Sequence, residues 1–247
     1  MTSFYKNNTG AKIFIMYYFD DPEKILFEQR KSCLTSNSKK PYEPHLTLFQ
    51  IEFNTQHHLW RKVKKALKSS EFGETIQEAY NNVFYNSTLI YNQGGYTLLG
   101  HKNGIPQFFA KDFGSDANIT LFRMAIYNFI QNVIRTDEFF RKERKINGKN
   151  WFEYCYPKTN SRKSLFVVPG HSHGVGVWTP HITICHIQDL KPGIRKMFDK
   201  CGQDKERKLL LLRPIWNSRF QPFDDIKMDN GTVQVTMGRN VVQQIWI

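Results

Sequence analysis

Three observations predict a protein of the α+β class. Segments rich in β-branched and aromatic residues, which favour strands, occur in both halves of the chain. Segments whose apolar residues recur at helical spacing lie between them. The chain has 247 residues, of which 40% are hydrophobic, so a sizeable core can be buried. No proline-, serine- or glycine-rich linker divides the sequence, and we expect residues 1–247 to form a single domain.

In the first half of the chain, the expected elements begin with a strand over residues 12–19, which are almost all aliphatic or aromatic. Residues 56–69 fit a helix, because their apolar residues form one stripe among many lysines and arginines. Residues 96–100 are a short apolar run and a further strand candidate. A longer helix is expected over residues 119–140, where isoleucine, phenylalanine and valine recur at helical spacing.

In the second half, residues 177–187 form an apolar run typical of a strand. A helix is expected over residues 189–200, followed by an apolar run at 208–212. Residues 231–237 and 240–247 are two strand-like runs near the C-terminus and predict two more strands.

Charge and composition restrict the possible partners. The formal net charge is +13 and the sequence pI is about 9.5, which favours phosphate-bearing partners over neutral or cationic ones. No apolar run approaches the ~18 residues of a membrane span, and residues 1–8 are too polar for the core of a signal peptide. The four cysteines lack the paired spacing of a zinc site or a disulfide framework. We therefore expect a cytoplasmic protein with no membrane association and no metal or other cofactor.

One short motif, Pro-His-apolar-Thr-apolar, occurs twice. The two copies are Pro44-His45-Leu46-Thr47-Leu48 and Pro180-His181-Ile182-Thr183-Ile184. Because residues two apart in a strand point to the same face, each copy presents an imidazole and a hydroxyl together, with Leu46 or Ile182 on the opposite face. Two unrelated strands with inward-facing His and Thr are the alternative interpretation. Because the two copies match at five positions, the interpretation that both motifs belong to one functional site is favoured.

Such a pair supplies a general base, a general acid and two hydroxyl donors for phosphate oxygens. His45 and His181 are the candidate acid and base, in either order, and Thr47 and Thr183 are the candidate hydroxyl donors. Two aromatic residues just before the motifs, Tyr42 and Trp178, are candidates for stacking on a nucleobase, although core packing explains them nearly as well.

The paired motifs resemble the signature of the two-histidine (2H) phosphoesterase superfamily, the LigT-like enzymes. The resemblance implies a two-lobed fold, in which two antiparallel sheets flanked by helices surround a central cleft. The first lobe is expected around residues 12–70 and the second around residues 165–247. Because the motifs lie far apart for this family, insertions are expected near residues 71–115 and 141–170.

The resemblance further implies a metal-independent phosphodiesterase acting on a nucleotide or oligonucleotide, without an obligate protein partner. Our leading interpretation is cleavage of 2′–5′-linked signalling nucleotides, of the 2′–5′ oligoadenylate or 2′,3′-cGAMP type. The Asn-, Lys-, Tyr-, Phe- and Ile-rich composition is typical of AT-rich viral genomes and suggests immune evasion in a host cytoplasm. An RNA 2′,3′-cyclic phosphodiesterase and a non-catalytic nucleotide- or RNA-binding module are the alternatives.

Overall fold

The computed structural model has the mixed α+β architecture expected from the sequence. The residues that it describes are 10–36, 43–55, 57–91, 95–100, 104–114, 116–136, 180–217 and 225–247. The strands are β1 (Gly10–Tyr18), β2 (His45–Asn54), β3 (Leu89–Tyr91), β4 (Tyr96–Leu99), β5 (Phe108–Asp112), β6 (His181–His186), β7 (Asp225–Lys227), β8 (Thr232–Met237) and β9 (Asn240–Trp246). The helices are α1 (Asp21–Leu34), α2 (His58–Ala66), α3 (Ser70–Phe84), α4 (Ala117–Arg135), the 3₁₀ helix η1 (Ile187–Asp189), α7 (Pro192–Lys200) and α8 (Lys205–Asn217).

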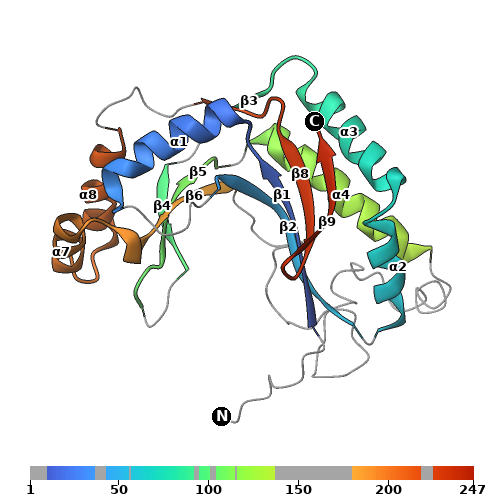
Figure 1. Ribbon diagram of the computed structural model, residues 1–247, viewed down its shortest axis with the longest axis horizontal. Helices are drawn as coiled ribbons and strands as arrows, with labels where there is room; N and C mark the ends of the chain where they lie inside the picture. The colour runs from blue at the N-terminus through green and yellow to red at the C-terminus, as the bar shows by residue number, and fades with distance from the viewer. Residues whose placement is uncertain are drawn as a thin grey trace, which may run out of the picture.

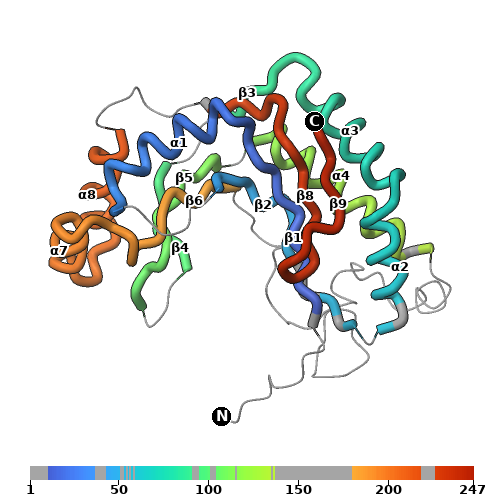
Figure 2. The backbone as a smooth tube through the Cα atoms, viewed as in Figure 1, coloured from blue at the N-terminus to red at the C-terminus, as the bar shows by residue number. Residues whose placement is uncertain are grey.

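Seven of the described strands form one antiparallel sheet in the order β4-β5-β6-β2-β1-β8-β9. The remaining described strands, β3 and β7, pair with each other in a small second sheet. Figure 1 shows the large sheet curved like an arch, with α1, α7 and α8 outside one limb and α2, α3 and α4 outside the other. The same path in Figure 2 shows that β8 and β9, near the C-terminus, lie beside the N-terminal strand β1.

Alternation along the strands determines which face of the sheet is buried under the helices. On β1, Ile13, Ile15 and Tyr17 are fully buried, whereas the residues between them are only half-buried. On β2, Leu46 and Leu48 are fully buried in the same core. The period of two therefore places one side of each strand against the helices and the other on the concave face of the arch.

The chain segments around the two motifs have matching arrangements. Each motif strand follows a strand and a helix, as β1–α1–β2 in one case and β5–α4–β6 in the other. The β1–β2 register skips Leu48 and the β5–β6 register skips Ile184, so each motif strand has a bulge directly after its threonine. Each helix packs near the motif strand of the other segment. Helix α1, which precedes β2 in the chain, packs near β6, and α4, which precedes β6, packs near β2. This arrangement fits the internal repeat suggested by the two motifs.

Several elements differ from the sequence expectation. The two motif strands lie in one continuous sheet rather than in two, because β2 and β6 pair directly. The range 71–115 contains α3, β3, the expected strand β4, and β5, which was not expected. The range 141–170, where a second insertion is expected, lies outside the described residues. The apolar run at 208–212 lies inside α8.

Helix α1 was not expected from the sequence at all. Its buried face contains Arg30 and Lys31 beside Phe27 and Leu34, and such charged residues weaken an apolar stripe. A local signal was present nonetheless. Asp20 caps the helix by accepting a hydrogen bond from the Glu23 backbone N–H at 3.2 Å, and a proline occupies the first turn.

A buried hydrogen bond joins α4 to the first motif strand. Arg123, only 6% exposed, donates from Nε to the backbone carbonyl of Leu48 at 3.0 Å. We expect Arg123→Met, which keeps the aliphatic packing but removes the donor, to lower the free energy of unfolding by about 1–3 kcal/mol, because it leaves a buried carbonyl without this bond. Urea denaturation measures this change. Asn128→Ala, on the exposed side of the same helix, is the control, and equal stability of both variants would contradict the assignment.

Candidate active site

The structure brings both motifs together at the centre of the large sheet. Leu46 of β2 lies directly opposite Ile182 of β6 in an antiparallel pair. This register places His45 beside Thr183, and Thr47 beside His181.

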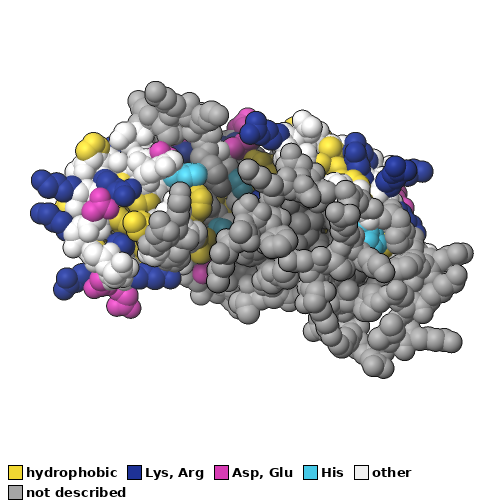
Figure 3. Space-filling view, turned by 90° about the horizontal axis from the view of Figure 1, so that it is seen from below, with side chains coloured by type: hydrophobic (Ala, Val, Ile, Leu, Met, Phe, Trp, Pro, Cys, Tyr) yellow, Lys and Arg dark blue, Asp and Glu magenta, His cyan; other side chains and the backbone are white. Residues whose placement is uncertain are grey.

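All four polar side chains lie on one face of the sheet. Each is half-buried, whereas Leu46 and Ile182 on the opposite face are 0% and 1% exposed. Figure 3, which shows the molecule from below the arch, has histidine side chains near the middle of this face. The two motifs thus form one mixed cluster of imidazoles and hydroxyls.

The His45 ring is held by its local surroundings. Nδ1 lies 3.0 Å from the backbone carbonyl of Glu43. Because a carbonyl can only accept, this contact assigns the proton of the neutral ring to Nδ1 and leaves Nε2 as the nitrogen that can take up a proton. The ring of Tyr18, opposite on β1, packs against the imidazole with centroids 5.3 Å apart.

Burial lowers the pKa of His45 below its ordinary value of 6.5, because the charged ring loses solvation. The nearby His181 lowers the pKa further, since two imidazolium charges repel each other. The Glu43 carbonyl acts in the opposite direction but is outweighed. At neutral pH, His45 is therefore a neutral ring suited to accept a proton.

The neighbouring strands complete this face of the sheet. Across β1, Tyr18 and Met16 lie opposite His45 and Thr47, and across β5, Asp112 lies opposite His181. The Asp112 carboxylate accepts a hydrogen bond from the Gly114 backbone N–H at 2.6 Å. The sequence predicts a strand over residues 12–19 but contains no signal that distinguishes Tyr18 from its neighbours. Only the register between β1 and β2 shows which tyrosine of the Tyr17-Tyr18 pair meets the histidine.

The two predicted base-stacking residues, Tyr42 and Trp178, lie outside the described residues. Among the described residues, no group of three His, Cys, Asp or Glu side chains is arranged to hold a metal ion. None of the described helices combines the length and the apolar character needed to cross a membrane.

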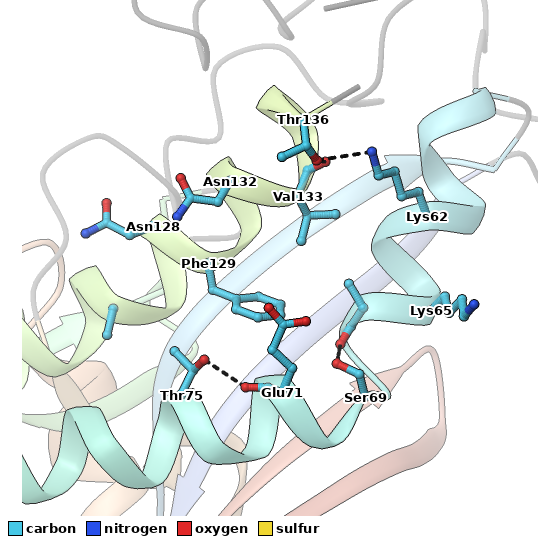
Figure 4. Close-up of a pocket in the computed structure, with 12 residues that line it drawn as sticks. Lys62, Lys65, Ser69, Glu71, Thr75, Asn128, Phe129, Asn132, Val133 and Thr136 are labelled. Carbon is cyan, nitrogen blue, oxygen red and sulfur yellow. Dashed lines mark hydrogen bonds between the residues drawn. The ribbon is translucent and has the colours of Figure 1, made fainter. Parts of the chain in front are cut away.

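A cavity of about 750 Å³ lies away from the motif strands, between α2, α3 and α4. Figure 4 shows the Glu71 side chain in front of the Phe129 ring at its centre, and Lys62 at its edge. Lys62 donates a hydrogen bond to the Thr136 hydroxyl at 3.1 Å. The described residues that line the cavity come from α2, α3, α4 and the ends of these helices, and the described side chains of β2 and β6 are not among them.

Comparisons of the chain with protein-family models, with curated proteins and with solved structures returned no match.

The proximity of the two histidines is directly testable. We expect His181→Gln to raise the pKa of His45, because the substitution removes a neighbouring positive charge and keeps a side chain of similar size. An NMR titration of the His45 ring protons measures the shift. His186→Gln, at the far end of β6, is the matched control and should leave the His45 titration unchanged. An unaltered pKa in His181→Gln would show that the rings do not interact.

Proposed function

We propose that this chain is a phosphodiesterase of the two-histidine type. The observation that carries the proposal is the direct pairing of β2 and β6, which gathers His45, Thr47, His181 and Thr183 on one face of the sheet. We likewise propose that the sheet corresponds to the 2H phosphoesterase fold suggested by the motifs.

In this mechanism one imidazole removes a proton from the attacking hydroxyl or water, and the other protonates the leaving oxygen. Thr47 and Thr183 donate hydrogen bonds to the non-bridging phosphate oxygens as their negative charge grows. Each threonine lies beside the histidine of the opposite motif, so each end of the site has one acid–base group and one hydroxyl. A phosphate held between the strands would contact both types of group at once.

For the substrate, we propose a nucleotide with a 2′–5′ phosphodiester linkage. The net charge of +13 supports a substrate that carries phosphates, since positive charge raises the local concentration of polyanions. The ring of Tyr18 beside His45 supports a nucleotide, because an aromatic side chain can stack on a base near the reacting phosphate.

A hydrolysis panel in the presence of EDTA tests the proposal. The panel contains 2′–5′ oligoadenylate, 2′,3′-cGAMP, a 3′,3′-cyclic dinucleotide and an RNA with a 2′,3′-cyclic end. We expect turnover of the 2′–5′-linked substrates, with no effect of the chelator. Turnover of the cyclic RNA end alone would assign the protein to RNA-end processing. Binding without turnover of any substrate would leave a non-catalytic module.

Substitutions separate chemistry from folding. We expect His45→Ala and His181→Ala each to lower kcat by about 10²–10⁴-fold, the usual contribution of a general acid or base. Thr47→Val and Thr183→Val remove a hydroxyl at nearly constant volume and should lower kcat by about 10²–10³-fold, the usual cost of losing one donor to a developing negative charge. His186→Gln is the control, because His186 lies at the other end of β6 from His181 and packs against Phe108, with ring centroids 4.6 Å apart. Thermal unfolding of each variant verifies that the fold is retained. Full activity in either His→Ala variant would contradict the mechanism.

A further inference from the structure

An ion pair connects helix α1 to the residue that orients His45. Lys24 Nζ lies 2.6 Å from Glu43 Oε1, and the two side chains are 28% and 50% exposed. Lys24 is placed by the first turn of α1, where its backbone N–H donates to the Asp20 carbonyl at 3.0 Å. The ion pair therefore joins the start of α1 to the start of β2.

Glu43 has a second contact through its backbone, because its carbonyl accepts the hydrogen bond from His45 Nδ1. Pro44, which follows it and is buried, restricts Glu43 to extended backbone conformations. Pro44 restricts the backbone of Glu43, and Lys24 holds its side chain. These two restraints together fix the direction of the Glu43 carbonyl.

We propose that Lys24 and Glu43 are positioning residues that keep His45 in its Nδ1–H tautomer and direct Nε2 toward the concave face of the sheet. In terms of the proposed function, on which this step rests, His45 is then the general base and His181 the general acid. The first of the two motifs would accordingly bind the attacking oxygen, and the second the leaving oxygen.

The sequence of the second motif supports this asymmetry. The position equivalent to Glu43 is Thr179, which has no carboxylate with which to form an ion pair. The chain at Pro180 is attached in another way, since its backbone carbonyl accepts a hydrogen bond from the Phe113 N–H at 2.9 Å. The two motifs thus share their histidine and threonine but differ in the residue that precedes them.

The ionisable groups around His45 are few among the described residues. Glu43 lies on its own segment, Tyr18 faces it from β1, and His181 faces it from β6, with Asp112 beyond on β5. Of these, Glu43 is the group whose charge Lys24 offsets.

NMR of the full-length protein with ¹⁵N-labelled histidine tests the tautomer without any substrate. At a pH where the ring is neutral, we expect wild-type His45 to carry its proton on Nδ1. Lys24→Met and Glu43→Gln should lower the ratio of the Nδ1–H to the Nε2–H form by about two- to fivefold, the range expected for one partly exposed ion pair. Lys24→Arg should restore the wild-type ratio, because arginine also pairs with a carboxylate.

Asp21→Asn is the matched control. Asp21 Oδ1 lies 3.7 Å from the same Lys24 Nζ, so the variant removes a charge next to the lysine but leaves the pair with Glu43 intact. Its tautomer ratio should equal that of the wild type. An Nε2–H ring in the wild type, or a ratio that Lys24→Met and Glu43→Gln leave unaltered, would overturn the proposal.

Kinetics distinguish this inference from the proposed function. If the wild type hydrolyses the panel substrates, Lys24→Met should lower kcat by up to about fivefold, with KM unchanged, and Lys24→Arg should recover it. If the wild type shows no turnover but the tautomer responds as expected, the positioning of His45 stands and the phosphodiesterase assignment fails. Normal kcat together with an unaltered tautomer would overturn the positioning role alone.

Discussion

The candidate site depends on one backbone contact, the antiparallel pairing of Leu46 with Ile182 at the centre of the sheet. Both side chains are buried under the helices, and their removal from water fixes the register of the two strands. A slip of one residue in either strand would turn its histidine and threonine into the apolar core and bring leucine or isoleucine to the concave face. The apolar residue inside each motif is thus as necessary to the site as the polar residues around it.

The same pairing brings the two imidazoles close enough for His181 to act electrostatically on His45. Burial and the nearby His181 both lower the pKa of His45, so its ring is neutral near neutral pH. Acid–base chemistry needs one ring that accepts a proton and one that donates it. The contact between His45 and the Glu43 carbonyl adds a structural difference between two otherwise similar motifs.

The sequence predicted what depends on local pattern. Periodicity and short-range composition predict the motif strands and the helices α2, α4 and α7. They also predict that Leu46 and Ile182 face away from the histidines, and both side chains are buried in the core. The direct pairing of β2 with β6 could not be predicted from the sequence, because pairing between distant segments leaves no local signal. Helix α1 was missed since Arg30 and Lys31 lie on its buried face. Tyr18 and Glu43 were missed for another reason, as their roles arise from strand register and from a contact with Lys24.

The central position of the motif strands also governs the order in which the protein can fold during synthesis. β2 lies between β1, which is made early, and β6, which belongs to the second half of the chain, while β1 in turn pairs with β8 near the C-terminus. Pairings between such distant segments form slowly, because a long loop must close before any contact is gained. Until β6 is made, one edge of β2 has no strand partner in this sheet, and open edges of this kind are where chains associate wrongly. The arrangement that brings the histidines together therefore leaves an edge of β2 open until the second half of the chain has been made.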